Sequence, residues 1–261
     1  MDEQVKKDYE EYEKLGRIWG NFDKEGIRKI KFPRPDRKIV EQLMELDDLT
    51  STISDVLDSI GINGAIPASY IAPLIPGKKL VGPAITLRSI PERKTPTQGY
   101  ADKDFIRMAT RDVYYLAEPG DVFVADYGGD LEVSNMGGQS CTVARSCGIV
   151  GSICNGAVRD IPAILKMDFP VWSCGRTPMT GKFRLAAIEI NGPVTLWKVI
   201  VMPGDLVVAD DSGVCVIPID KAEVVLEKVR SILAEEAKMR DMIANKVSIA
   251  ELKPYYRKRY K

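Results

Sequence analysis

The sequence predicts an α/β domain, and three features of the chain support this prediction. Between residues 122 and 174, short apolar runs alternate with segments of helical spacing, as they do where strands and helices build one sheet. Residues 184–210 alternate polar and apolar side chains between turns, which is typical of antiparallel strands. An apolar stripe from Val225 to Ile243 indicates a long closing helix. With 261 residues and 45% hydrophobic content, we expect one large domain with extensions.

The first part of the chain predicts an extension and one short helix. Residues 1–35 are rich in Lys, Glu and Tyr and end at two prolines, so we expect a helical extension and an extended link, packed on the domain or on a neighbouring subunit. Residues 50–61 combine a Ser/Thr cluster, an apolar stripe and a final glycine, the signature of an amphipathic helix. The main domain then covers residues 36–247, and residues 248–261 form a basic tail.

The middle of the chain predicts the sheet. Residues 62–88 are divided by glycines and prolines into short apolar runs, ending in the strand-like VGPAITLRSI. Residues 101–116 have helical spacing through Phe105, Met108, Ala109 and Val113, and we expect a helix there. The segments that follow are a strand at 122–126, a helix at 139–148, a strand at 149–154, a helix after Arg159, a strand at 170–174, and antiparallel segments at 184–190, 194–201 and 206–210.

One motif occurs twice. Residues 118–129 and 202–213 share Pro-Gly-Asp, a β-branched run and then Ala-Asp. We interpret Asp121 and Asp205 as turn residues, because Pro-Gly-Asp is a common turn before a strand. Asp126 and Asp210 stand at strand ends, where sites of α/β proteins often form, and stay candidates for function.

Composition excludes several classes of site and partner. The chain has no histidine, which excludes Ser-His and Cys-His catalysis and His-bound zinc. A metal bound only by oxygen ligands would be Mg²⁺ or Mn²⁺. Lys+Arg and Asp+Glu both number 37, so we expect no nucleic-acid partner and no membrane partner. The basic, aromatic end PYYRKRYK is expected to be a disordered or subunit-packing tail.

The cysteines and the charged start predict a cytoplasmic location. The five cysteines show no Cys-x-x-Cys spacing and follow no signal peptide, so we expect reduced thiols. No apolar run approaches the roughly 20 residues of a membrane helix.

The stretch from residue 127 to residue 160 carries the candidate chemistry. Backbone amides near Gly137, Gly138 and Gln139 open a helix and can hold a carboxylate or phosphate, or form only a tight turn. Arg159 beside Asp160 would place an anion clamp next to a hard oxygen ligand. The alternative is a surface ion pair in which Asp160 caps the following helix.

Several segments together resemble one known family. TSTISDVLDSIG, LVGPAITLRS, GIVGSICNGAVRDIPAI, FPVWSCGRTP and VMPGDLVVADDSGVCVIP are similar to the RraA-like family, over about residues 40 to 245. This family includes the 4-hydroxy-4-methyl-2-oxoglutarate/4-carboxy-4-hydroxy-2-oxoadipate aldolases and the regulator of ribonuclease E activity. The resemblance implies a compact β/β/α swivelling-type domain in a homotrimer or homohexamer, with sites between subunits.

The resemblance also implies roles for individual residues. In the aldolases of the family, an acid-x20-Arg-Asp signature holds the site, and Arg159 and Asp160 match its second half. Arg159 would bind the pyruvyl carboxylate and Asp160 would ligate Mg²⁺ or Mn²⁺. Gly138 stands where the family has its first acid, and Asp130, Glu132 and Gln139 are candidates to compensate. A further acid from the C-terminal helix of the adjacent subunit corresponds to Glu236, with Glu235 as the alternative. Arg176 is the candidate for a distal substrate carboxylate.

Three functions follow as expectations. The first is a metal-dependent lyase that cleaves or decarboxylates a small 2-oxo or hydroxy-oxo dicarboxylic acid through a pyruvate enolate. The second uses the same metal and oxo-acid site for isomerisation or dehydration. The third is a non-catalytic regulator of the RraA type.

Overall fold

Four parallel strands form the centre of one large sheet. The computed structural model describes residues 1–104 and 107–258. In that part of the chain the strands follow the order β1-β11-β10-β3-β4-β5-β6-β2, with β7 paired to β3 as a ninth strand. The parallel centre consists of β3 (Leu80–Pro91), β4 (Val122–Ser134), β5 (Gly151–Val158) and β6 (Val171–Arg176).

Antiparallel strands extend this centre on both sides. They are β1 (Ala65–Pro67), β2 (Ala72–Pro73), β7 (Leu185–Ile190), β10 (Leu206–Asp210) and β11 (Gly213–Ile217). The segment 194–201 forms two strands, β8 (Val194–Leu196) and β9 (Val199–Val201), because Trp197 adopts a left-handed backbone conformation and turns the chain into a hairpin. The predicted antiparallel pattern is confirmed.

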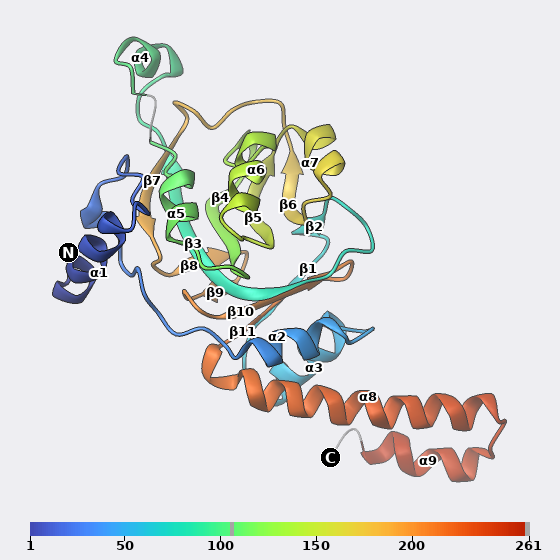
Figure 1. Cartoon of the computed structure of the whole chain (residues 1–261). Helices are drawn as coiled ribbons and strands as arrows, with labels where there is room; N and C mark the ends of the chain where they lie inside the picture. The colour runs from blue at the N-terminus through green and yellow to red at the C-terminus, as the bar shows by residue number, and fades with distance from the viewer. Residues whose placement is uncertain (105–106, 259–261) are drawn as a thin grey trace.

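Helices cover the sheet in two groups (Figure 1). The first group packs beside the parallel strands and consists of α5 (Thr110–Leu116), α6 (Gly138–Ser146) and α7 (Ile161–Met167). The second packs across β10 and β11 and consists of α2 (Arg37–Met44), α3 (Thr50–Ser59) and α8 (Ala222–Ala244). The fold is the predicted α/β class with an N-terminal helix and a long C-terminal helix, and this prediction is confirmed.

The prediction of one continuous helix over residues 101–116 is wrong. The structure has α4 (Pro96–Ala101) and then α5, separated by turns in which Lys103 and Ala109 have positive φ angles of 56° and 50°. A left-handed residue ends helical hydrogen bonding, which apolar spacing alone does not reveal. Phe105, used in that prediction, lies outside the described residues.

The N-terminal segment packs on the same domain. Asp2 caps α1 (Glu3–Lys14), whose Val5 and Tyr12 belong to the same apolar core as the sheet side chains. A short 3-10 turn, η1 (Lys24–Gly26), follows. Arg34 then pairs with the fully buried Asp121 through two hydrogen bonds of 2.8 Å each. The extension is therefore joined to the domain at its start and at its end.

The C-terminal segment is helical. After the short η2 (Ile219–Lys221), α8 runs away from the sheet and α9 (Ile249–Lys258) folds back beside it (Figure 1). Of the two alternatives for the basic tail, disorder is wrong for the residues of α9, while subunit packing stays a prediction. Residues 259–261 lie outside the described part. Among the described helices, none combines the length and apolar character needed to cross a membrane.

The repeated Pro-Gly-Asp motif makes the same turn twice, on the two sides of β3. Oδ2 of Asp121 accepts a hydrogen bond from the Glu118 amide at 2.8 Å, and Oδ2 of Asp205 accepts one from the Met202 amide at 2.9 Å. The strands that follow are β4 and β10, which both pair with β3, one parallel and one antiparallel. The interpretation of these two aspartates as turn residues is confirmed.

Candidate functional site

Arg159 and Asp160 lie in the sharp connection between β5 and α7. Asp160 holds the N-cap position of α7 in a left-handed conformation, with φ of 57°. Its side chain makes no capping hydrogen bond to α7, so the cap alternative is wrong for the carboxylate. The amide of Arg159 donates to the carbonyl of Met136 at 3.0 Å, which ties this connection to the loop before α6.

The glycines before α6 hold the Asp160 carboxylate. The amide of Gly138 donates to Oδ2 of Asp160 at 3.0 Å, and Nε of Arg159 lies 3.7 Å from the same oxygen. A Cβ atom at Gly137 would lie 2.6 Å from that oxygen, so only glycine leaves room for it. The predicted free amide of Gly138 is therefore occupied by a side chain of the protein.

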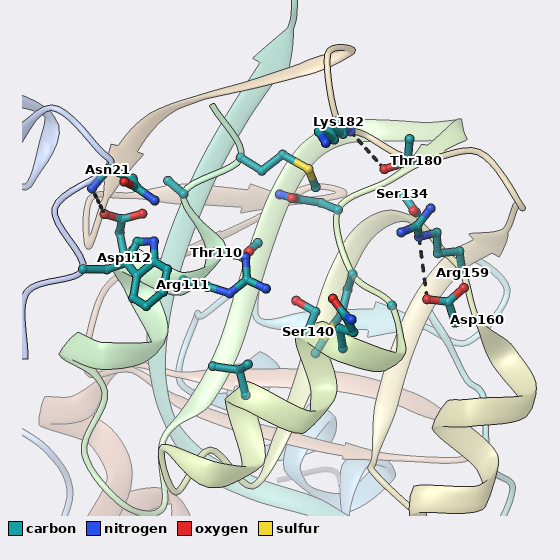
Figure 2. A pocket seen from close by; sticks show the side chains of 18 residues that line it. Asn21, Thr110, Arg111, Asp112, Ser134, Ser140, Arg159, Asp160, Thr180 and Lys182 are labelled. Carbon is teal, nitrogen blue, oxygen red and sulfur yellow. Dashed lines mark hydrogen bonds and ion pairs between the residues drawn. The ribbon is translucent and has the colours of Figure 1, made fainter. Parts of the chain in front are cut away.

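A pocket of about 610 Å³ opens beside this pair (Figure 2). Its wall comes from the N-terminal extension, α5 and the residues before it, the end of β4 and the loop after it, α6, and the two connections that carry residues 159–160 and 180–182. Its charged lining residues are Arg111, Asp112, Arg159, Asp160 and Lys182. The structure thus brings together four predicted site residues, namely Gly137, Gln139, Arg159 and Asp160.

Other predicted residues lie away from this pocket. Arg176 pairs in register with Val158 at the end of β6 and does not line it. Asp130 uses Oδ1 to accept hydrogen bonds from the amides of Glu132 and Val133, which makes it a turn residue. The strand-end acids are also structural: Asp126 accepts from the Thr195 amide and Asp210 from the Thr50 amide.

The acids of the closing helix do not reach the pocket of their own chain. Glu235 and Glu236 lie on α8, which packs on the other side of the molecule from α6 and α7 (Figure 1). Glu236 lies 3.7 Å from Arg240. A role for Glu236 therefore requires a neighbouring subunit, as the resemblance implies.

Sequence reasoning missed the opposite wall of the pocket. Trp19 and Asn21 come from the extension, and Arg111 and Asp112 come from α5. One signal was present in the sequence: Ala-x-Arg-Asp occurs at residues 109–112 and again at 157–160. Both copies place their Arg-Asp pair in the wall of one pocket.

Asp112 holds the extension in place. Its Oδ1 accepts hydrogen bonds from the amides of Asn21 at 2.9 Å and Phe22 at 3.0 Å. Burial raises the pKa of this carboxyl, and the hydrogen bonds from Phe22 and Asn21 oppose that rise. Asp112 is therefore committed to the fold rather than available to a ligand.

Asn135 is a second residue that the sequence did not single out. It lines the pocket, is 2% exposed, and its Oδ1 has no hydrogen-bond partner within the described residues. Leaving such an oxygen unpaired costs about 1–3 kcal/mol. A bound donor at this wall would recover part of that cost.

The donor set decides whether the site fits a divalent cation. Oδ2 of Asp160 is used by Gly138, while Oδ1 has no hydrogen-bond partner in the described part of the chain. No group of three or more Cys, Asp or Glu side chains among the described residues can hold a metal together. Mg²⁺ commonly uses one or two protein carboxylates and completes its shell with water and substrate oxygens. The residues present fit an ion shared with the substrate and do not form a closed protein cage.

Comparison with known proteins places the chain in a family. The family described as RraA-like, Aldolase/RraA, matches residues 50–216. The chain is 35% identical over 201 residues to a Halalkalibacterium halodurans protein named "Putative 4-hydroxy-4-methyl-2-oxoglutarate aldolase", covering 77% of this chain and 87% of that protein. It is 29% identical over 231 residues to Protein DlpA of Legionella pneumophila, covering 86% of this chain but 36% of DlpA, so it spans about a third of that relative.

A solved structure agrees with this placement. Streptomyces coelicolor RraAS2, described as an unusual member of the RNase ES inhibitor RraA protein family, superposes with a TM-score of 0.69 at 29% identity. The likeness covers 80% of this chain and 99% of RraAS2. The chain belongs to the RraA-like family of aldolases and RraA proteins.

Proposed function

We propose that the protein is a divalent-metal-dependent lyase acting on a small 2-oxo or hydroxy-oxo dicarboxylic acid. The observation that supports this most is the pairing at the pocket wall, where the Gly138 amide holds one oxygen of Asp160 and Arg159 lies directly beside it. Such a wall offers a cation for a carboxylate and an oxygen for a hard metal ion at adjacent positions. The relative named as an aldolase supports the same reaction class.

In this mechanism Arg159 pairs with the carboxylate next to the 2-oxo group and orients the substrate in the pocket. Mg²⁺ or Mn²⁺, held by Asp160, would supply Lewis-acid stabilisation of the negative charge that develops on the substrate oxygen. For a 4-hydroxy-2-oxo acid, the C4 hydroxyl proton passes to water and the C3–C4 bond breaks. Its electron pair forms the enolate of pyruvate, which takes up a proton at C3, and C4 becomes a carbonyl carbon.

Assembly and location belong to the same proposal. A homotrimer or homohexamer would bring Glu236 of one subunit towards the pocket of the next, which a single chain does not do. We propose a cytoplasmic enzyme whose partners are small oxo acids and copies of itself.

One observation favours a second reaction at the same site. Residue 138 contributes a backbone amide where the resemblance places an acid. Without that acid, isomerisation or dehydration of the same oxo acids becomes the competing function. The products distinguish the two functions, because only the lyase releases pyruvate.

The test is pyruvate release from 4-hydroxy-4-methyl-2-oxoglutarate and from oxaloacetate, with Mg²⁺, Mn²⁺ or EDTA, after subtraction of the uncatalysed rate. Asp160→Asn should lower turnover at least about 100-fold, as loss of a key electrostatic group does. Asp168→Asn is the matched control, since Asp168 has φ of 53°, flanks the other end of α7 and pairs with Lys78. Turnover that survives Asp160→Asn or EDTA would contradict the proposal.

A further inference from the structure

We propose that Arg111, oriented by Trp19 of the N-terminal extension, binds the second carboxylate of the substrate. The inference rests on the proposed function for the position of the first carboxylate at Arg159. It gives residues 1–35 a role in positioning Arg111. It also makes Arg111, in place of Arg176, the candidate that binds the distal carboxylate of the substrate. The substrate class stays that of the proposed function, and the inference concerns which arginine holds the second carboxylate.

Arg111 stands in an ordered aromatic stack. The ring of Trp19 stacks on Tyr115 with centroids 5.5 Å apart and an angle of 4° between the planes. The Arg111 guanidinium carbon lies 5.7 Å from the centroid of the Trp19 ring. A flat ring beneath a guanidinium restricts its orientation, so fewer conformations are lost when an anion binds.

The extension is fixed where it carries Trp19. Arg17 donates to the carbonyl of Tyr115 at 3.1 Å and to Oε1 of Glu118 at 2.8 Å. On the other side of Trp19, Asp112 accepts the two amide hydrogen bonds described above. Trp19 is thus held between two attachments to α5 and the residues after it.

Arg111 has no carboxylate of its own within ion-pair distance in the described part of the chain. The neighbouring Asp112 is buried and bound to the extension, and Asp160 is bound to the Gly138 amide. Arg111 itself is exposed at the pocket wall. A guanidinium carries five donors and recognises a carboxylate in a bidentate manner, so this wall fits an anion from outside the chain.

The two arginines face the same pocket from different elements. Figure 2 shows Arg111 entering from the side of Asp112 and pointing towards Ser140, while Arg159 and Asp160 stand on the other side of Ser140. A substrate with one carboxylate on Arg159 and another on Arg111 crosses the start of α6. A 2-oxo acid that lacks the second carboxylate leaves Arg111 without a partner.

This arrangement selects between the two lyase reactions. Retro-aldol cleavage of 4-hydroxy-4-methyl-2-oxoglutarate keeps the distal carboxylate intact in the second pyruvate, so Arg111 can hold it throughout. Decarboxylation of oxaloacetate removes the distal carboxylate as CO₂, and an arginine bound to that group would stabilise the reactant. We therefore expect retro-aldol cleavage to depend on Arg111 more than decarboxylation does.

The experiment compares two retro-aldol substrates that differ in the distal carboxylate, 4-hydroxy-4-methyl-2-oxoglutarate and 4-hydroxy-2-oxopentanoate, with Mg²⁺. Arg111→Gln should lower the ratio of their kcat/KM values about 10- to 100-fold, the range for a charged hydrogen bond. Arg176→Gln should leave the ratio unchanged. The inference is overturned if the ratio of kcat/KM values is unchanged in Arg111→Gln, or if it falls in Arg176→Gln.

Trp19 is a positioning residue and needs its own control. Trp19→Leu should lower the same ratio through KM of the dicarboxylate, and Trp19→Tyr should restore most of it. Trp197→Leu is the matched control, because Trp197 also carries a cation over its ring, Lys198 at 4.5 Å, but lies outside the pocket. Equal effects of Trp19→Leu on both substrates would indicate a purely structural role and overturn this part.

Binding separates this inference from the proposed reaction. Calorimetry compares 2-oxoglutarate with 2-oxopentanoate, which has the same carbon chain and no second carboxylate. If the wild type releases no pyruvate from any substrate, the lyase proposal fails, while a preference for 2-oxoglutarate that Arg111→Gln or Arg111→Met removes still supports the anion site. Equal affinity of the wild type for both acids overturns the anion site, whatever the turnover.

Discussion

The backbone amide of Gly138 donates a hydrogen bond to Oδ2 of Asp160 at 3.0 Å, so residue 138 holds the carboxylate through its main chain. The neighbouring Gly137 has no space for a side chain, since its Cβ would lie 2.6 Å from that oxygen. At Gly138, the closest atom to a Cβ is Cβ of Ala163 at 3.0 Å. A side chain at residue 137 would therefore collide with the Asp160 carboxylate, whereas one at residue 138 would make only a tight contact with the Ala163 side chain.

This difference predicts opposite outcomes for two alanine substitutions. Gly137→Ala should displace Asp160 and lower turnover about 100-fold or more, the range for loss of one preorganised group. Gly138→Ala keeps the amide and should retain activity, with stability changed by about 1 kcal/mol or less, because the helical preference for alanine offsets the tight contact. Steady-state kinetics and thermal unfolding of both variants check this. Similar losses of turnover in both would show that the Asp160 contact does not decide activity.

Restoring an acid at residue 138 should strengthen metal binding. Gly138→Asp adds a carboxylate beside Asp160, and an outer-shell carboxylate typically changes metal affinity about 10- to 100-fold. Ala163→Gly in the same chain removes the 3.0 Å contact that the new Cβ would make. Titration of Mn²⁺ against the single and double variants measures the gain. Unchanged Mn²⁺ affinity in the folded double variant would mean that an acid there cannot act on the Asp160 site.

The buried pair between Arg34 and Asp121 should contribute most of the stability with which the end of the extension is attached to the domain. Asp121 has a fully buried side chain, so Arg34→Met leaves a carboxylate without its cation. Such a loss costs about 3–5 kcal/mol, which corresponds to a fall in Tm of roughly 6–20 °C. Arg28→Met is the control, because Arg28 is 58% exposed in its pair with Glu189 and should change stability by about 1 kcal/mol or less. Calorimetry measures the Tm of both variants, and equal falls in Tm would contradict this ranking.

The attachment of the extension should weaken in acid. Burial raises the pKa of Glu118, but hydrogen bonds from Arg17 and Tyr12 outweigh it and lower that pKa below the ordinary 4.5. A lowered acid pKa adds stability that is fully present above the ordinary value and is lost as the pH falls through the lowered value. Trp19 emission and proteolysis near Arg17 should therefore report release of the extension below about pH 4.5.

The control for this pH dependence is Glu118→Gln, which should remove the acid transition and leave the extension weakly held at every pH. Asp112 acts in the opposite direction, since burial raises its pKa above the ordinary 3.8. Its contribution is fully present below 3.8 and falls as the pH rises through the raised value. A transition that persists in Glu118→Gln would assign the pH effect to another group.

The sequence predicted those helices and strands that have local signals. It also predicted the wall of the pocket that carries Arg159 and Asp160. Arg159 and Asp160 follow a strand and precede a helix, so a short stretch of chain sets their surroundings. Trp19 reaches the pocket because the chain on both sides of it binds residues about ninety or more positions away, Arg17 at Tyr115 and Glu118 and the amides after Trp19 at Asp112, and no periodicity encodes such contacts. Arg176 does not line the pocket of its own chain and pairs in register with Val158 at the end of β6, so its predicted role at a distal carboxylate stays a prediction.

Arg111 and Asp112 are consecutive residues, and one faces the pocket while the other binds the extension. Their adjacency couples the binding of a substrate acid to the docking of the extension. Asp112 holds residues 21 and 22, while Arg111 rests against Trp19 and faces the pocket. By thermodynamic reciprocity, any acid that binds more tightly when the extension is docked must itself favour the docked state by the same factor. The first residues of the chain would then act as a ligand tethered to the domain, and substrate binding would raise the fraction of molecules in which they are docked.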